Sequence, residues 1–165
     1  MGESVDITIR RATRADVAAL GRLGGMLMRA HYAFDPKRFL APGDDAESGY
    51  GWFLNTQLTE PDVAVFVADQ EGAVVGYVYI GVEPLSWKEL RDEAGFIHDI
   101  AVAEHARRIG IARRLMDAAA EWFRARGTDR MMLWTAQQNT GAQRLFEALG
   151  FRRTMVEMTK EILDF

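Results

Sequence analysis

Apolar and polar residues recur along the chain with a period of two in some segments and of about 3.6 in others. The first period predicts strands and the second predicts helices. Residues 6–11 alternate, which predicts a strand with one face in solvent, at the edge of a sheet. Residues 63–68 and 74–82 are apolar on both faces, as is typical of central strands. The Glu71-Gly72 pair between them predicts a tight turn, so these two strands should form an antiparallel hairpin.

Helices are expected in four segments. The first begins near Thr13, which has an acid three positions later, as in a capping box. Prolines and glycines interrupt the pattern between residues 31 and 51, and a second helix should reach to about Leu58. Two further helices are expected over residues 110–127 and 140–149, each ending at a glycine.

Three more strands are expected over residues 96–102, 129–135 and 153–159. The predicted order is β-α-α-β-β-β-α-β-α-β, without an internal repeat, low-complexity tract or linker. Such an order packs as one mixed α/β sheet with helices on its faces. We therefore expect residues 1–165 to form a single domain.

Composition narrows the function without deciding it. Hydrophobic residues make up 48% and charged residues 27% of the chain, close to the averages for soluble globular domains. The chain has no cysteine, which excludes disulfides, thiolate zinc sites and a cysteine nucleophile, and we expect no metal centre. A net charge of −4 argues against a general nucleic-acid binder and suits a cationic substrate. No apolar run approaches the roughly 20 residues of a membrane span, and the N-terminus lacks a targeting pattern, so the expected location is cytoplasmic.

The candidate chemistry lies between the strand at 96–102 and the helix that follows it. A helix start has unpaired amides and a partial positive charge, and the small residues Gly110 and Ala112 would let a phosphate approach them. Arg107, Arg108 and Arg113 add positive charge where the helix dipole favours acids, which indicates an anionic partner. The alternative is a solvated basic turn before an ordinary helix. The segment lacks Gly-Lys-Ser/Thr, which excludes a P-loop.

This segment resembles the GNAT superfamily of acyl-CoA-dependent N-acyltransferases. The family signature, Arg/Gln-x-x-Gly-x-Gly/Ala after an apolar-x-Val strand end, is matched by Arg107, Gly110 and Ala112 after Ile100-Ala101-Val102. A second family element, an Asn that opens a helix ending in Gly-Phe, is matched by Asn139 and by Gly150-Phe151. The resemblance implies a mixed, mostly antiparallel twisted sheet with helices on both faces, and acetyl-CoA as the cofactor.

The resemblance also implies where the cofactor binds. The strands at 96–102 and 129–135 would diverge and admit the pantetheine arm, which would pair with the main chain of the first strand. Amides from Arg108 to Arg113 would hold the pyrophosphate, and Asn139 would hydrogen-bond the arm near the thioester. The implied cofactor-binding residues are Ile100, Ala101, Val102, Arg107, Arg108, Ile109, Gly110, Ile111, Ala112, Arg113, Asn139 and Phe146.

The implied reaction is direct attack of an amine on the thioester. An alkylamine has a pKa near 10.4, so holding it neutral at pH 7 costs about 4.6 kcal/mol and calls for a base. His98 and Asp99 are the candidate catalytic residues, and strict strand alternation would let only one of them face the thioester. A structural role for His98, an orienting role for Asp99, and a water chain ending at Glu83 or Glu93 are the alternatives.

Phe146 stands where many family members have a tyrosine that protonates the departing thiolate. Phenylalanine cannot do so, and a thiolate with a pKa near 8.5 is a tolerable leaving group without help. Tyr32 and Tyr50 are the candidates to replace that acid.

The acceptor site is expected between residues 30 and 52, with His31, Tyr32, Asp35 and Trp52 as substrate-binding residues. Aromatic and acidic side chains suit a small cationic amine, although a solvated loop with a few anchoring aromatics fits the same residues. Two other functions stay open: an acyl-CoA sensor without turnover, and acetylation of protein N-termini or lysines. The resemblance also implies that two copies can associate as a homodimer.

Overall fold

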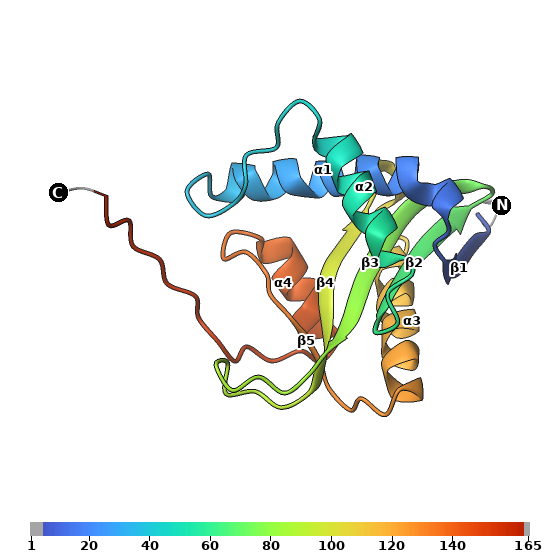
Figure 1. Cartoon of the computed structure of the whole chain (residues 1–165). Coiled ribbons are helices and arrows are strands. Elements are labelled where there is room, and N and C mark those ends of the chain that lie inside the picture. The colour runs from blue at the N-terminus through green and yellow to red at the C-terminus, as the bar shows by residue number, and fades with distance from the viewer. Residues whose placement is uncertain (1–4, 164–165) are drawn as a thin grey trace.

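Five strands form one sheet in the order β1-β2-β3-β4-β5, as the computed structural model shows for residues 5–163 (Figure 1). The first four strands pair antiparallel, and β5 lies parallel to β4. The bounds are Ile7–Arg11 (β1), Val63–Gln70 (β2), Ala73–Glu83 (β3), Ala94–Val102 (β4) and Met131–Leu133 (β5). The expected mixed, mostly antiparallel sheet is confirmed, and so are the exposed-edge position of β1 and the β2–β3 hairpin.

Helices cover both faces of this sheet, as expected (Figure 1). Their bounds are Val17–Phe34 (α1), Ala46–Gln57 (α2), Ile111–Ala125 (α3) and Thr140–Ala148 (α4). The capping pattern at Thr13 begins a short 3-10 turn, Arg14–Asp16, and α1 follows directly. No helix among residues 5–163 combines the length and the apolar character that crossing a membrane requires.

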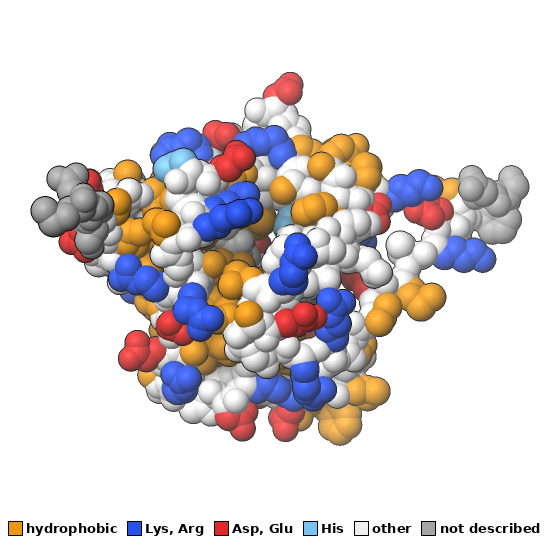
Figure 2. All heavy atoms as spheres, turned by 180° about the vertical axis from the view of Figure 1, so that it is seen from behind, with side chains coloured by type: hydrophobic (Ala, Val, Ile, Leu, Met, Phe, Trp, Pro, Cys, Tyr) orange, Lys and Arg blue, Asp and Glu red, His pale blue; other side chains and the backbone are white. Residues whose placement is uncertain are grey.

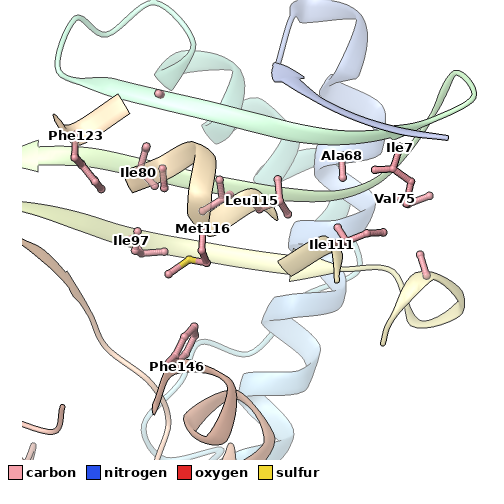
Figure 3. Close-up of a cluster of buried hydrophobic side chains, with 14 residues drawn as sticks. Ile7, Ala68, Val75, Ile80, Ile97, Ile111, Leu115, Met116, Phe123 and Phe146 are labelled. Carbon is pink, nitrogen blue, oxygen red and sulfur yellow. The ribbon is translucent and has the colours of Figure 1, made fainter. Parts of the chain in front are cut away.

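A separate hydrophobic core holds the helices to each face. On one face, α1 and α2 pack on Val65, Val67 and Tyr77 of the sheet. On the other, the apolar stripe of α3 lies over β3 and β4, with Phe146 of α4 at the margin (Figure 3). Burying one large apolar side chain contributes about 1.5–3 kcal/mol, so these two cores fix the sheet and present β4 between them.

The expected strand at 153–159 is absent from the structure. From Arg152 to Leu163 the chain is extended and exposed, forms no strand, and leads away from the body (Figure 1). Just before it, the Phe151 amide donates to the Phe146 carbonyl (3.0 Å), and Phe151 packs on the core around α3. Beyond this anchor, the described part of the chain does not turn back along β5. Alternating apolar residues show that a segment can form a strand, but they do not supply the neighbour with which it pairs.

Candidate functional site

The strands β4 and β5 pair over only three residues each, Gly95–Ile97 with Met131–Leu133, and beyond them β4 has an open edge among the described residues. The amide of Ala103 donates to Val75 of β3 at 2.7 Å. Successive residues of a strand direct their main-chain groups to opposite sides. Since Ala103 points its amide at β3, the main-chain groups of Ile100 and Val102 point to the open edge. Part of that edge is taken by Arg107, whose Nε donates to the Val102 carbonyl at 3.0 Å.

The turn before α3 offers unpaired amides beside this edge. Arg108 and Gly110 have φ of +66° and +87°, which bends the chain so that α3 begins at Ile111. The first α-helical hydrogen bond runs from Arg114 N to Gly110 O at 3.1 Å, so the amides of residues 111–113 have no partner within the helix. No acid lies in the first turn of α3, and the space over Gly110 is open. The turn can therefore hold an anion, with Arg107, Arg108 and Arg113 exposed around it.

A β-bulge places His98 and Asp99 side by side. Tyr79 of β3 is opposite Asp99, but the next residue, Ile80, is opposite Ile97, so His98 has no partner. Such an extra residue interrupts the alternation of faces. The strict alternation that the prediction for these two side chains assumed therefore does not hold between His98 and Asp99. The His98 ring lies 4.8 Å from that of Tyr79, and the Asp99 carboxylate accepts a hydrogen bond from Tyr77, two residues along the same face of β3.

His98 is a part-buried histidine with acidic neighbours. Its side chain is 29% exposed, and its Nε2 lies 3.4 Å from Glu83 Oε1. Burial lowers the pKa of His98 below the usual 6.5, and the charges of Glu83 and Asp99 partly oppose that change. The imidazole is therefore neutral at pH 7 and can accept a proton.

Asp99 is held from the α1–α2 side of the sheet. Tyr50 of α2 and Tyr77 of β3 both donate hydrogen bonds to its Oδ2, the second at 3.2 Å. Burial raises the pKa of Asp99, and the two hydrogen bonds oppose the rise. Burial also raises the pKa of Tyr50 and of Tyr77, so both hydroxyls keep their protons. The proton of Tyr50 is thus directed at Asp99, which makes this side chain a poor acid for a leaving thiolate.

A cavity of about 240 Å³ opens beside His98, on the side of the sheet where β4 and β5 part. Phe96 and Trp134 form aromatic walls, with their rings 6.0 Å apart and edge to face. The Arg91 guanidinium lies over the Phe96 ring at 5.1 Å. The full lining consists of Glu83, Glu89, Arg91, Phe96, Ile97, His98 and Trp134. Aromatic rings and carboxylates together can hold a cation that carries apolar carbon.

The sequence did not indicate this cavity. Phe96 lies in β4 and Trp134 directly follows β5, whereas Glu89 and Arg91 belong to the connection between β3 and β4, where Ser86 and Arg91 form an isolated bridge. One usable signal was present: Phe96 and His98 are two positions apart in a strand, a spacing that places both side chains on one face, and their rings stack at 5.9 Å.

The expected acceptor residues are only partly brought together. His31, at the end of α1, has its Nδ1 2.8 Å from the Leu27 carbonyl, and its charge lowers the pKa of Asp99. Asp35 follows α1 and accepts from the Lys37 amide at 3.1 Å. Tyr32, which lies between these two residues in the sequence, is half-buried. Trp52 is 68% exposed on α2, whereas Tyr50 of the same helix faces the sheet, so the structure does not bring Trp52 to the site.

Asn139 and Phe146 have structural contacts. Asn139 caps α4, its side-chain oxygen accepting from the Ala142 amide at 3.2 Å, and its side-chain amino group has no hydrogen bond within residues 5–163. Phe146 is buried in the core beside α3, with its ring 5.9 Å from that of Phe151 (Figure 3). The helix cap uses only the Asn139 side-chain oxygen, so its amino group can still donate to a ligand.

Known proteins share both the sequence pattern and the fold. The model of the Acetyltransferase (GNAT) family matches residues 26–151. An uncharacterized N-acetyltransferase of Archaeoglobus fulgidus is 29% identical over 147 residues, which cover 88% of this chain and 92% of that protein. A mycothiol acetyltransferase of Thermobispora bispora is 32% identical over 93 residues, or 56% of this chain. The chain spans about a third of the length of the mycothiol acetyltransferases that it matches.

Solved structures superpose over nearly the whole chain. A tetramutant of the BH1408 protein from Bacillus halodurans has a TM-score of 0.82 at 23% identity, covering 94% of this chain and 99% of that one. The aminoglycoside N-acetyltransferase AAC(6')-Iy, in complex with CoA, has a TM-score of 0.74 at 21% identity, with 99% of both chains covered. At these identities the comparison establishes the fold.

Proposed function

Because the chain belongs to the GNAT acetyltransferase family, we propose that it transfers an acetyl group from acetyl-CoA to a primary amine on a small cationic molecule. One observation carries the proposal: the unpaired amides that open α3 lie at the end of the same open β4 edge that carries His98 and Asp99. If the start of α3 holds the diphosphate of acetyl-CoA, the arm that carries the thioester would extend along this edge toward His98 and Asp99.

The chain's own groups can hold such a donor. The amides of residues 111–113 and the arginines at 107, 108 and 113 present positive charge to a diphosphate. The main-chain groups of Ile100 and the amide of Val102 would pair with the pantetheine arm, as in the addition of a strand, while the Val102 carbonyl keeps its hydrogen bond from Arg107. The Asn139 side-chain amino group supplies one more donor, at the start of α4.

The proposed role of His98 is to take the proton from the attacking amine. A neutral imidazole at pH 7 is available for this, because burial keeps the His98 pKa low. The new C–N bond forms as the C–S bond breaks, the amine proton passes to His98, and coenzyme A leaves as a thiolate. Asp99 is assigned as a positioning residue, since its carboxylate is fixed by Tyr50 and Tyr77 and its charge raises the pKa of His98.

The cavity beside His98 supports the choice of a cationic acceptor. Glu83 and the exposed ring of Trp134 offer a carboxylate and an aromatic surface within one cavity, while the Phe96 ring already carries the Arg91 guanidinium. The overall charge of −4 also favours the approach of a cation. The names of AAC(6')-Iy and of the mycothiol acetyltransferases refer to small molecules, in agreement with this acceptor class.

The test is release of coenzyme A thiol from acetyl-CoA over a panel of polyamines, amino sugars and lysine peptides, with mass spectrometry of the products. The protein contains no cysteine, so every thiol detected comes from the donor. We expect release that requires an amine, with small polycations preferred. Tight coenzyme A binding without release over any acceptor would instead favour an acyl-CoA sensor, the function suggested by an apolar residue at Phe146. Preference for peptides would favour a protein acetyltransferase.

A further inference from the structure

The connection between β3 and β4 exposes large apolar side chains next to the cavity beside His98. Trp87 and Leu90 are 85% and 91% exposed, and Trp134, which lines the cavity, is 74% exposed. The connection lies at the lower end of the sheet (Figure 1), and apolar side chains gather at that end of the molecule in the space-filling view (Figure 2). Apolar residues gathered on a surface in this way mark a place where a ligand or a partner binds.

The turn that carries Trp87 and Leu90 is held in one shape. Two main-chain hydrogen bonds between Ser86 and Arg91, of 2.8 and 3.1 Å, close residues 87–90 into a tight turn, the Trp87 turn. The Arg91 side chain is 10% exposed and donates to the carbonyls of Pro84 and Asp92 at 3.2 and 2.8 Å. Because these bonds fix the turn before any ligand arrives, its ordering costs little when a ligand binds.

Leu90 has a strained backbone and an uncovered side chain. Its φ of +52° lies in the left-handed region, which favours glycine or asparagine and is unfavourable for a leucine. Within residues 5–163, the exposed side chain gains no packing that would offset this strain. Strain of this kind is concentrated at ligand sites. An apolar side chain at this position therefore indicates a contact that is made when a ligand is bound.

The charges in the cavity decide which end of a ligand enters it. The Glu89 carboxylate is paired with Arg91 at 2.9 Å, whereas no arginine or lysine of the described chain pairs with Glu83, whose neighbour is His98 at 3.4 Å. Burial lowers the pKa of His98, so the neutral imidazole does not balance the Glu83 charge at pH 7. A cationic end would therefore bind at Glu83, next to the proposed base.

Trp134 and the Trp87 turn flank the mouth of the cavity. Phe96 and Ile97 belong to its buried part, whereas Trp134 lines it and is largely exposed. Glu89, a member of the Trp87 turn, also lines the cavity, so each residue of that turn lies within about 7 Å of the lining along the chain. The part of a ligand that projects from the cavity would thus meet apolar side chains from two segments of the chain.

We infer that the acceptor carries an apolar group beside its reacting amine, and that Trp134 and the Trp87 turn bind this group at the mouth of the cavity. This acceptor class rests on the proposed acetyl transfer and narrows it to amphipathic amines, such as polyamines or amino sugars that bear an alkyl or aryl substituent. Each methylene buried on this surface should increase affinity by up to about fourfold.

The first experiment compares acetyl transfer to 1,3-diaminopropane with transfer to its N-butyl, N-hexyl and N-octyl derivatives, which share one cationic head. We expect kcat/KM to rise by at least about tenfold from the parent to the N-octyl compound, through a lower KM at nearly constant kcat. Trp87→Ala and Trp134→Ala should each remove most of this rise. Met158→Ala is the control, because Met158 is 89% exposed on the C-terminal segment and does not line the cavity, and it should keep the full rise.

A rise that is absent from wild type, or equal in all four proteins, would overturn the inference. Circular dichroism checks that the variants are folded, and light scattering after size exclusion compares their masses. A mass that falls in Trp87→Ala, with the chain-length dependence unchanged, would assign the Trp87 turn to contact with a second copy and would also overturn the inference.

The second experiment tests the same surface without turnover. Octyltrimethylammonium and tetramethylammonium cannot be acetylated, and their affinities are measured by isothermal titration calorimetry. We expect the octyl compound to bind at least about tenfold more tightly, with the difference lost in Trp87→Ala and Trp134→Ala and kept in Met158→Ala. Equal affinities for the two cations would overturn the inference even if acetyl transfer proceeds. The expected difference without thiol release from any amine would support the binding surface and contradict the proposed function alone.

Discussion

The Tyr50 hydroxyl donates a hydrogen bond to the Asp99 carboxylate from a helix 49 positions earlier in the chain. Through this bond α2 is joined to the residue beside the proposed base, so the N-terminal helices belong to the chemistry as well as to the core. Tyr77, which is fully buried, holds the same carboxylate oxygen. The arrangement keeps a part-buried carboxylate in one orientation next to His98.

The raised pKa of Asp99 predicts a pH-dependent stability difference for Asp99→Asn. The folded state binds this proton more tightly than the unfolded state, so wild-type stability is lost as pH rises through the folded pKa. Asn removes the titration while still accepting a hydrogen bond from tyrosine. Between about pH 4 and the folded pKa, the free energy of unfolding of the variant should rise relative to that of wild type, by at most about 1.4 kcal/mol per pH unit. Urea unfolding at a series of pH values measures this difference. A difference that stays constant from pH 4 to 8 would show that Asp99 does not titrate as described.

The pKa of His98 predicts the acid limb of turnover. Because burial lowers this pKa below 6.5, kcat at saturating substrates should fall only below that pH. His98→Ala should reduce kcat by roughly 10²–10⁴-fold and remove the limb.

Glu83→Gln is the matched test of the same assignment. Glu83 raises the pKa of His98, so its neutralisation should move the limb to lower pH while most of kcat is retained. An NMR titration of the three histidines measures the His98 shift directly. A limb that stays in place when the His98 resonance moves would exclude His98 as the base.

Gly24 lies against the ring of Tyr50, and its replacement tests the positioning of Asp99. A Cβ at Gly24 would come 2.0 Å from the ring, so Gly24→Ala must displace Tyr50, at a cost of about 1–3 kcal/mol. We expect kcat to fall at least tenfold. Gly49→Ala is the control, because Gly49 precedes Tyr50 in α2 and has nothing within 4 Å of a built Cβ. That change should stabilise α2 by up to about 1 kcal/mol and leave kcat unaltered, and equal losses in the two variants would contradict the positioning role.

Most elements could be predicted from the sequence because their signals are local. The apolar runs of β2 and β3, the stripe of α3 and the glycine turns all depend on neighbours within a few positions. The same holds for the turn at Gly110, although its φ of +87° means that any larger residue there would strain the backbone as well as obstruct an anion. The substitution of Gly110 is therefore a weaker test of anion binding than substitution of the arginines.

The parts that could not be predicted depend on contacts between distant segments. The bulge at His98 is visible only in the register of β4 against β3, and no local pattern distinguishes it from a regular strand. The link from Tyr50 to Asp99 and the aromatic walls from Phe96 and Trp134 arise from tertiary packing. The strand expected at 153–159 was wrong, because apolar alternation within a segment does not show which strand it would pair with.

Coenzyme A affinity of the arginine variants, measured by isothermal titration calorimetry, tests the central claim most directly. Arg108→Ala and Arg113→Ala each remove a charge at the α3 start, whereas Arg114→Ala removes one that lines a separate groove with Ile9 and Phe66. A charge-assisted hydrogen bond contributes about 1.5–3 kcal/mol, so the first two variants should raise Kd by roughly 10- to 100-fold, and the third should leave it within about twofold. Equal Kd values for all three variants and wild type would show that the turn before α3 does not bind the diphosphate.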